Sequence, residues 1–363
     1  MAKGMACATI VWHHLVFYGP MSDVAQPLAP GLMAWLYEYG RMAVQVFLVL
    51  GGYLAAGSLA PQGLARFDHA GLQIARRFVR LVVPYAVALV VAVLAAALAR
   101  PFMDHPSVPG DPSLRQLLAN ALLLQDIVGA EALSAGVWYV AIDFQLFSLM
   151  VLLFAGARSV LGRSGARWAA AMGRVLVVAG VAASLWWANL QADWDMWAVY
   201  FFGSYGLGVL ACWAVRAADS RRAWGWAAVM VALGLIALAI EYRTRIAVAL
   251  VTALLMAACM RKGVLAGFER GQWLAQLGQM SYSVFLIHFS ICLVVNAVVS
   301  HFWPEGLWTN AVGMAAAFGL SLAAGRVLYE QIERHVPSWS QALRWQAGLV
   351  GTGLLVAATG HVL

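Results

Sequence analysis

The chain has 363 residues, of which 63% are hydrophobic and only 11% are charged. Soluble domains carry about 45 to 50% apolar and about 25% charged residues, so this composition excludes a soluble enzyme and predicts an all-α, polytopic integral membrane protein. The formal net charge of +7 is interpreted as a topology signal and gives no reason to expect nucleic-acid binding.

Apolar runs follow one another along the whole chain and predict about 10 to 11 transmembrane helices, several near the short end of the usual span of roughly 17 to 25 residues. We expect a transmembrane domain over residues 1–340, an extra C-terminal transmembrane helix over residues 341–363, and no soluble domain. A shorter amphipathic run, Ser113–Ile127, is expected to be interfacial or re-entrant. The apolar runs are Gly4–Tyr18, Gly40–Leu59, Leu81–Leu98, Val137–Phe154, Val175–Leu190, Trp197–Val215, Trp224–Ile240, Ile246–Met260, Met280–Val299, Ala311–Leu328 and Ala347–Val362.

The distribution of cations predicts a cytoplasmic N-terminus. Helical spans alternate sides, and cytoplasmic loops are enriched in Lys and Arg. With the N-terminus inside, most of the 23 Lys and Arg residues fall on the cytoplasmic side. The cations that remain for the outside or the membrane are Arg41, Arg100, Arg115, Arg243 and Arg245.

The first predicted helix, Lys3 to Tyr18, carries a cation at its start and a histidine pair in its middle. Eleven residues at 100° each turn about 1100°, within about 20° of three full turns, so Lys3 and His14 share one face. They are separated by roughly 16 Å along the axis, which places the cation at one surface of a bilayer core of about 30 Å and His14 near its middle.

The neighbouring His13 points about 80° away from His14, and adjacent helical residues do not converge on one metal ion. The four cysteines show neither CxxC spacing nor a Cys/His cluster. We therefore expect no metal site and no disulfide framework. The alternative for both histidines is a structural one, in which they hydrogen-bond to neighbouring helices.

Two other spans contain residues that are unusual inside a membrane. The second has a glycine pair, Gly51 and Gly52, which permits close approach of either a neighbouring backbone or a ligand. The fourth buries Asp143 about two turns in. A carboxylate there costs at least about 2.5 kcal/mol on insertion scales, so it is expected to have a partner or a task.

A basic cluster precedes the third span, where Arg76 and Arg80 lie one helical turn apart and Arg77 is adjacent to Arg76. Guanidinium groups match phosphate oxygens, so a phosphorylated ligand is one interpretation. Ordinary retention of cations on the cytoplasmic side, with contact to anionic lipids, is the other.

Taken together, these segments resemble the membrane-bound acyltransferase 3 family. Lys3 and His14 are similar to the cation and histidine of its first helix, VQVFLVLGGYL to its second-helix signature, and Arg76-Arg77 to its paired-arginine motif. The later stretches WYVAIDFQLF, LGQMSYSVFLIHFSI and Glu333-Arg334 resemble its remaining motifs in the right order. The family usually has Arg at the position of Lys3, Glu at that of Asp143, and about ten residues ahead of the first motif, so we expect the native chain to begin upstream.

The resemblance implies an enzyme of a bacterial cytoplasmic (inner) membrane that moves an acyl group, expected to be acetyl, from cytosolic acyl-CoA to a hydroxyl of an extracytoplasmic sugar. His14 would act as base or acyl carrier, with Asp143 orienting it and His13 beside it as the further catalytic candidate. Lys3, Arg76, Arg77 and Arg80 would bind the phosphates of acyl-CoA, the donor substrate, and no permanently bound cofactor is expected. The expected partners are acyl-CoA, a carbohydrate acceptor and the lipid bilayer. Acidic and aromatic residues of an outer loop, Asp193, Trp194, Asp195 and Trp197, are candidates for contact with the sugar.

A transporter is the alternative function. In it His14, Asp143 and His288 would form a proton relay, and the arginines would only set the topology.

Overall fold

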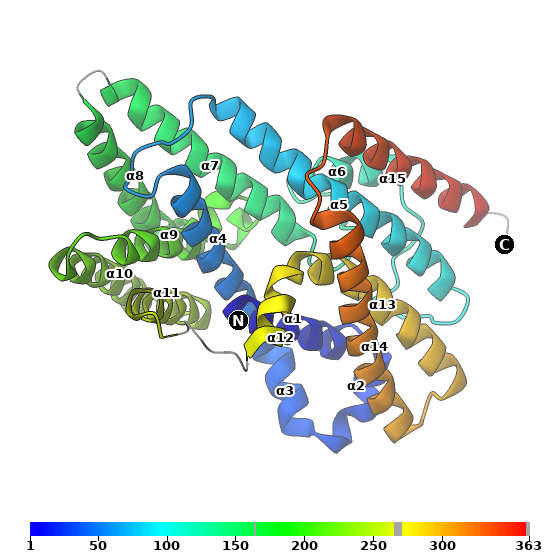
Figure 1. The fold of residues 1–363 in the computed structure, drawn as a ribbon. Helices are drawn as coiled ribbons and strands as arrows, with labels where there is room; N and C mark the ends of the chain where they lie inside the picture. The colour runs from blue at the N-terminus through cyan, green and yellow to red at the C-terminus, as the bar shows by residue number, and fades with distance from the viewer. Residues whose placement is uncertain (163–164, 265–270, 361–363) are drawn as a thin grey trace. The chain divides into compact units, whose positions relative to one another are not determined.

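The computed structural model describes residues 1–162, 165–264 and 271–360, and every regular secondary-structure element in these ranges is a helix (Figure 1). Within them, nine helices are long and apolar enough to cross a membrane. The prediction of an all-α, polytopic membrane protein is therefore confirmed. Arg163 and Arg270, two of the cations assigned to the cytoplasmic side, lie outside the described residues.

The nine membrane-spanning candidates coincide with nine of the predicted apolar runs. They are Pro30–Leu59, Ala70–Ala99, Trp138–Leu161, Ala166–Leu190, Ala198–Val215, Ser220–Ile240, Thr244–Lys262, Ser281–Phe302 and Leu307–Glu333. The first and last predicted runs also form helices, α1 (Ala2–Phe17) and α15 (Trp339–Gly360), but these are not among the nine, and α1 is only 16 residues long. That α15 crosses the membrane stays a prediction, and Val362 lies outside the described residues.

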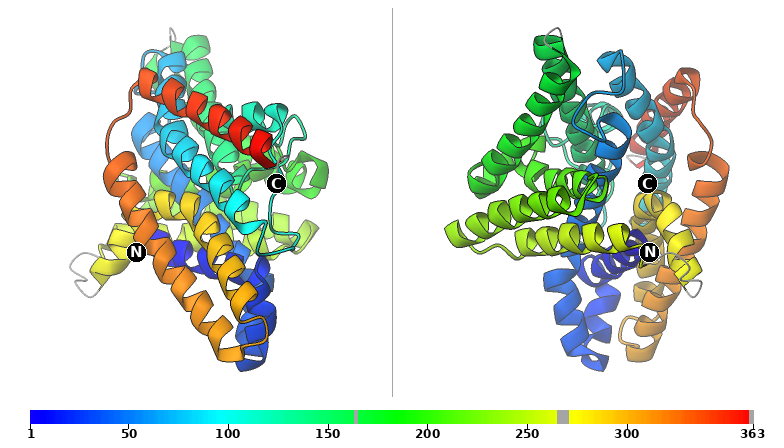
Figure 2. Two further views of the ribbon diagram at one scale, coloured as in Figure 1. Left: turned by 90° about the vertical axis from the view of Figure 1, so that its right-hand side faces the viewer. Right: turned by 60° about the vertical axis from the view of Figure 1, so that its left-hand side comes forward.

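The chain divides into two compact units, and the first contains residues 1–43, 78–141 and 271–363. Its helices are α1, α2 (Pro20–Ala25), α3 (Pro30–Tyr39), most of α5 (Ala70–Ala99), α6 (Leu114–Ala121), the first residues of α7 (Trp138–Leu161), α12 (Gln272–Gln279), α13 (Ser281–Phe302), α14 (Leu307–Leu328) and α15. Figure 2 shows α13 and α14 side by side as the long gold and orange pair. A π-helical segment, Tyr329–Glu333, continues α14.

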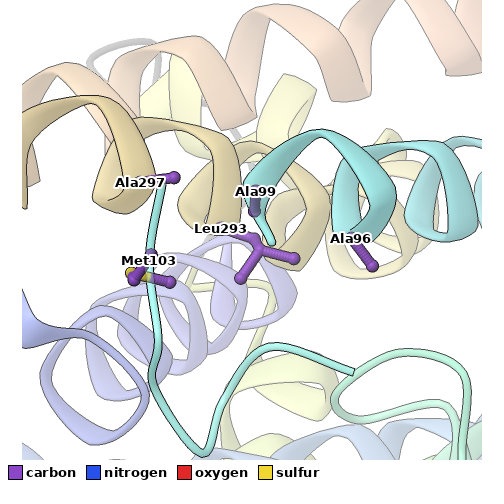
Figure 3. Packing of buried hydrophobic residues seen from close by; sticks show 5 residues of the cluster. All are labelled: Ala96, Ala99, Met103, Leu293 and Ala297. Atoms are coloured by element: carbon purple, nitrogen blue, oxygen red, sulfur yellow. The ribbon is translucent and has the colours of Figure 1, made fainter. Parts of the chain in front are cut away.

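Small side chains allow the C-terminal end of α5 to pack closely against α13 (Figure 3). Ala96 and Ala99 of α5 face Leu293 and Ala297 of α13, and Met103 closes the cluster from the following loop. All five are at most 7% exposed. In a membrane, where water gives little drive for helices to associate, such close packing of small residues is a main source of stability.

The amphipathic run that was expected to be interfacial or re-entrant contains α6, whose N-terminus is closed by a capping box. Ser113 accepts from the Gln116 backbone N–H, and the Gln116 side chain accepts from the Ser113 N–H. This arrangement satisfies two otherwise unpaired donors. Helix α15 packs against α6, with Gln346 Nε2 donating to the carbonyl of Ala121 at 2.6 Å.

The second unit contains residues 44–77 and 142–270. It comprises most of α4 (Ala43–Leu59), the first turns of α5, most of α7, α8 (Ala166–Trp186), α9 (Ala198–Val215), α10 (Ser220–Ile240) and α11 (Thr244–Lys262). Helix α9 packs against α8, α10 and α11 and is the most buried of the membrane-spanning candidates. Figure 2 shows α10 and α11 running side by side.

The glycine pair of the second predicted span lets α4 approach α9 backbone to backbone. A Cβ added at Gly52 would lie 1.8 Å from the carbonyl oxygen of Tyr205, and one at Gly208 would lie 1.9 Å from that of Val49. Neither position has room for a methyl group. Of the two interpretations of the pair, the structure therefore supports close packing at Gly52.

We expect Gly52→Ala to destabilise the protein by about 1 to 3 kcal/mol, because a methyl group there can be accommodated only if two helix backbones separate. Gly156→Ala on α7 is the matched control, since a Cβ there meets nothing within 4 Å and Ala favours a helix over Gly by about 1 kcal/mol. Thermal unfolding of both variants in the same detergent tests this expectation. A Gly52→Ala variant as stable as Gly156→Ala would contradict it.

Candidate active site

The centre of the candidate site is a direct hydrogen bond between two histidines of the first unit. His14 of α1 and His288 of α13 are 274 residues apart in sequence, yet His14 Nδ1 lies 2.6 Å from His288 Nε2. The two rings are nearly parallel, with 14° between their planes. Both side chains are buried, His288 completely and His14 with 7% of its surface exposed.

The partners of His288 determine which nitrogen atoms of the neutral pair carry protons. His288 Nδ1 lies 2.7 Å from the carbonyl oxygen of Phe285 and 3.2 Å from that of Val284. Carbonyl oxygens only accept, so Nδ1 of His288 carries the proton and its Nε2 holds the lone pair. His14 must then donate through its Nδ1–H. The lone pair of the second ring lies on His14 Nε2, and this atom has no hydrogen-bond partner among the described residues.

A glycine keeps space beside the His14 ring. Gly136 has a φ of +79°, and a Cβ there would lie 3.4 Å from His14 Cε1 and 2.9 Å from Phe285 Cζ. A side chain at this position would therefore be strained and would also press against the ring that carries the free lone pair. Tyr18 closes another side of His14, edge-on at 5.3 Å between ring centres.

The start of α13, which sets the position of His288, is fixed by a carboxylate from the end of the π-helical segment. Glu333 accepts from the backbone N–H of Ser283 at 3.1 Å and from its hydroxyl at 2.6 Å. The first turn of a helix has unpaired N–H groups and a partial positive charge, so a carboxylate is a favourable cap there. The serine-tyrosine-to-histidine stretch and the closing Glu333-Arg334 motif thus meet in this unit.

His13 is held in a different way from its neighbour. Its Nδ1 lies 2.8 Å from the carbonyl oxygen of Leu36 on α3, and this contact requires His13 to donate. Gly40 lies against the same side chain, since a Cβ there would be 2.7 Å from His13 Cβ. His13 thus attaches α1 to α3, as in the structural interpretation of the histidines, and its catalytic role stays a prediction.

In the second unit, Arg77 near the start of α5 donates a hydrogen bond to the carboxylate of Asp143 on α7, and the two side chains form an ion pair. The side chain of Asp143 is 10% exposed and that of Arg77 is 33% exposed. The guanidinium also lies over the ring of Phe147, 5.1 Å from its centre. The expectation that buried Asp143 has a partner is met by Arg77. That the same carboxylate also orients His14 stays a prediction.

The remaining predicted phosphate ligands lie on α1 and α5. Lys3 lies in the first turn of α1, where its Cβ is 3.6 Å from the position that a Cβ of Gly278 would occupy. Arg76 is exposed on α5. Arg80 donates to the carbonyl oxygen of His335 at 3.0 Å. Their binding to acyl-CoA stays a prediction.

Sequence reasoning gave His288 a place only in the transporter alternative and missed its contact with His14. The available signal was a histidine deep within an apolar span, where polar residues usually have a partner. Hydropathy gives the depth of each residue but not the neighbour that its helix will meet. Within the described residues, no group of three His, Cys, Asp or Glu side chains is arranged to hold a metal ion.

A family model for the acyltransferase domain of the acyltransferase 3 family matches residues 1–330, most of the chain and both histidines of the pair. No curated protein and no solved structure matches the chain. With nine membrane-spanning candidates in the described part and this match, the chain belongs to the acyltransferase 3 family of membrane acyltransferases.

Proposed function

We propose that the protein transfers an acyl group, specifically acetyl, from cytosolic acyl-CoA to a hydroxyl of an extracytoplasmic sugar or polysaccharide, and that the reaction takes place at Nε2 of His14. The observation that carries this proposal is the hydrogen-bond chain from the Phe285 carbonyl through His288 to His14. It orients the His14 ring and leaves a lone pair on the one nitrogen without a partner among the described residues. A bacterial inner membrane is the location that fits a cytosolic donor and an external acceptor.

Two routes use the same nitrogen. As a general base, His14 Nε2 removes the proton of the sugar hydroxyl while the sugar oxygen attacks the thioester carbonyl; the C–S bond breaks, and the CoA thiolate takes up that proton. As an acyl carrier, Nε2 attacks the thioester itself, the C–S bond breaks, and CoA leaves as the thiolate. The acyl-imidazolium then passes its acyl group to the sugar oxygen, and the proton of the sugar hydroxyl goes to the CoA thiolate. In both, His14 becomes positively charged, and its Nδ1–H bond to His288 strengthens with that charge.

The donor would be held by its phosphates at Lys3, Arg76, Arg77 and Arg80, which the predicted topology places at the cytoplasmic surface. The ion pair with Asp143 holds the Arg77 guanidinium in one orientation. On the opposite side, Trp194 and Trp197 are 37% and 45% exposed and would offer aromatic faces to a sugar, beside the carboxylates of Asp193 and Asp195.

We expect Arg77→Lys to weaken acyl-CoA binding by about tenfold while insertion and topology stay normal, because the charge is kept and the bidentate guanidinium fork is lost. Acyl-CoA affinity of the reconstituted variant is the measurement. Arg66→Lys, a cytoplasmic arginine of the same unit without a proposed role, is the control. A normally inserted Arg77→Lys protein with unchanged affinity would return these arginines to a purely topological role.

Reconstituted proteoliposomes without a solute gradient test the function as a whole. Radiolabelled acyl-CoA is supplied on one side, and both acyl consumption and label on an acceptor are measured. Consumption without a gradient supports the enzyme, whereas gradient-dependent uptake of a solute without acyl consumption supports the transporter. Mass spectrometry of surface glycans from cells with and without the gene then identifies the acceptor and the acyl mass together.

A further inference from the structure

The second unit contains a cavity of about 400 Å³ that is lined by four arginines and by no acidic residue. Arg167 and Arg174 come from the first half of α8, Arg216 directly follows α9, and Arg222 comes from the start of α10. Trp213 and Trp226 provide an aromatic wall, with 5.2 Å between their ring centres. None of these residues belongs to the site described above, and the predicted topology places all four arginines on the cytoplasmic side.

The walls of this cavity are fixed by packing and hydrogen bonding. The loop after α4 lies against α8, because Gly63 adopts a φ of +83° and a Cβ there would be 2.7 Å from both the carbonyl oxygen of Ala170 and Cγ of Arg174. The same loop is attached to α9, since Trp213 Nε1 donates to the carbonyl oxygen of Ala60 at 3.0 Å. The arginines therefore surround a preformed space.

Structural arginines elsewhere in this unit have oxygen acceptors. Arg243 donates to Asn189 Oδ1 at 2.5 Å and to the carbonyl oxygen of Leu185 at 2.8 Å. Arg261 donates to two backbone carbonyl oxygens at 3.2 Å. Such guanidinium groups hold helices together, and their hydrogen-bonding capacity is used within the protein.

The cavity arginines differ from these in their partners. Within the described ranges, Arg167, Arg174 and Arg216 form no ion pair with a carboxylate and no hydrogen bond to a carbonyl oxygen, and Arg216 is hydrogen-bonded to the thiol of Cys212. Arg167 lies over the ring of Trp168, and Arg222 pairs with Asp219 at 3.4 Å. Like charges that converge without a counter-charge repel one another, and a bound anion relieves that repulsion.

We propose that this cavity binds a phosphate-bearing anion. Its volume accommodates a phosphate or diphosphate group together with part of an attached organic moiety. Guanidinium forks match phosphate oxygens, and the two indoles suit the less polar part of such a ligand. The phosphate belongs either to the head group of an anionic phospholipid or to a soluble phosphate ester, and these two sources share the same recognition chemistry.

The test uses the full-length protein in nanodiscs. In discs of phosphatidylcholine alone, pyrophosphate is titrated and heat release is measured, which reports a soluble source. In discs that also contain phosphatidylglycerol, the lipid retained after extraction is measured by native mass spectrometry, which reports a lipid source. We expect saturable binding in at least one arm, and the double variant Arg174→Gln/Arg216→Gln is expected to weaken it by about tenfold or more, since two charge-assisted contacts are lost.

Arg221→Gln is the matched control, because this exposed arginine precedes Arg222 in the same helix turn but does not line the cavity. It should bind as the wild type does. If the double variant does not fold, Arg174→Lys replaces it and should bind more weakly while keeping the charge. Absence of saturable binding in both arms, or equal loss in Arg221→Gln and the cavity variants, would overturn the proposal. The measurement needs no acyl transfer, so it is independent of the proposed reaction.

Discussion

His14→Ala is expected to reduce acyl transfer by at least about 100-fold, because it removes the only nitrogen that the proposal assigns to the reacting atoms. His13→Ala should keep a readily measurable fraction of activity. It loses the hydrogen bond to the Leu36 carbonyl, which costs about 1 kcal/mol of stability and affects the active nitrogen only indirectly. The measurement is the initial rate of labelled acyl transfer in proteoliposomes at matched protein content.

The pair His14 and His13 is a stringent comparison, because the two residues are adjacent, chemically identical and both buried. They point to different sides of α1, so His14 contacts His288 and His13 contacts the carbonyl oxygen of Leu36. Equal loss of transfer in both variants, with both proteins folded, would mean that the contact with His288 does not select the reactive residue.

His288→Leu is expected to lower kcat by about 100-fold or more and to leave KM for acyl-CoA nearly unchanged. The substitution removes the acceptor of the His14 Nδ1–H bond, so the ring is free to rotate and to adopt the other tautomer. A comparable loss of orientation and tautomer is known to be costly in hydrolytic triads, where the orienting group never touches substrate.

His288→Gln separates positioning from packing. The glutamine carbonyl oxygen can still accept from His14, so this variant should recover part of the kcat that Leu loses, although neither replacement preserves the imidazole. Steady-state kinetics on the wild type, His288→Leu and His288→Gln measures kcat and KM separately. A His288→Leu enzyme with wild-type kcat, or a Gln variant no better than Leu, would remove His288 from the mechanism and leave it as a packing residue.

The sequence was sufficient for the class of fold because composition and hydropathy are summed over many residues. Eleven apolar runs and a strong bias of cations predict a polytopic bundle without any knowledge of which helices touch. The helical phase of Lys3 and His14 was likewise available, since both belong to one continuous helix, α1. Local periodicity therefore identified the residue at the centre of the candidate site.

Partners on other helices were not predictable in the same way. A partner was expected for Asp143 but was not identified as Arg77, and the contact of the His14 ring with His288 was not foreseen. Each of these contacts depends on the register between helices, which is set by shape, as in the fit of Gly52 against Tyr205. A single sequence contains no direct signal for that register, although buried polar residues indicate that partners exist.

The contact of Glu333 with the first turn of α13 has a consequence for how the chain can be shortened. The match to the family ends at residue 330, but the carboxylate that accepts from Ser283 lies three residues beyond it. A truncation at the edge of the match would remove this cap from the helix that carries His288, whereas a truncation after Ser338 would keep it and delete only α15. The smallest fragment suitable for expression is therefore defined by a helix cap and extends beyond the boundary that family similarity gives.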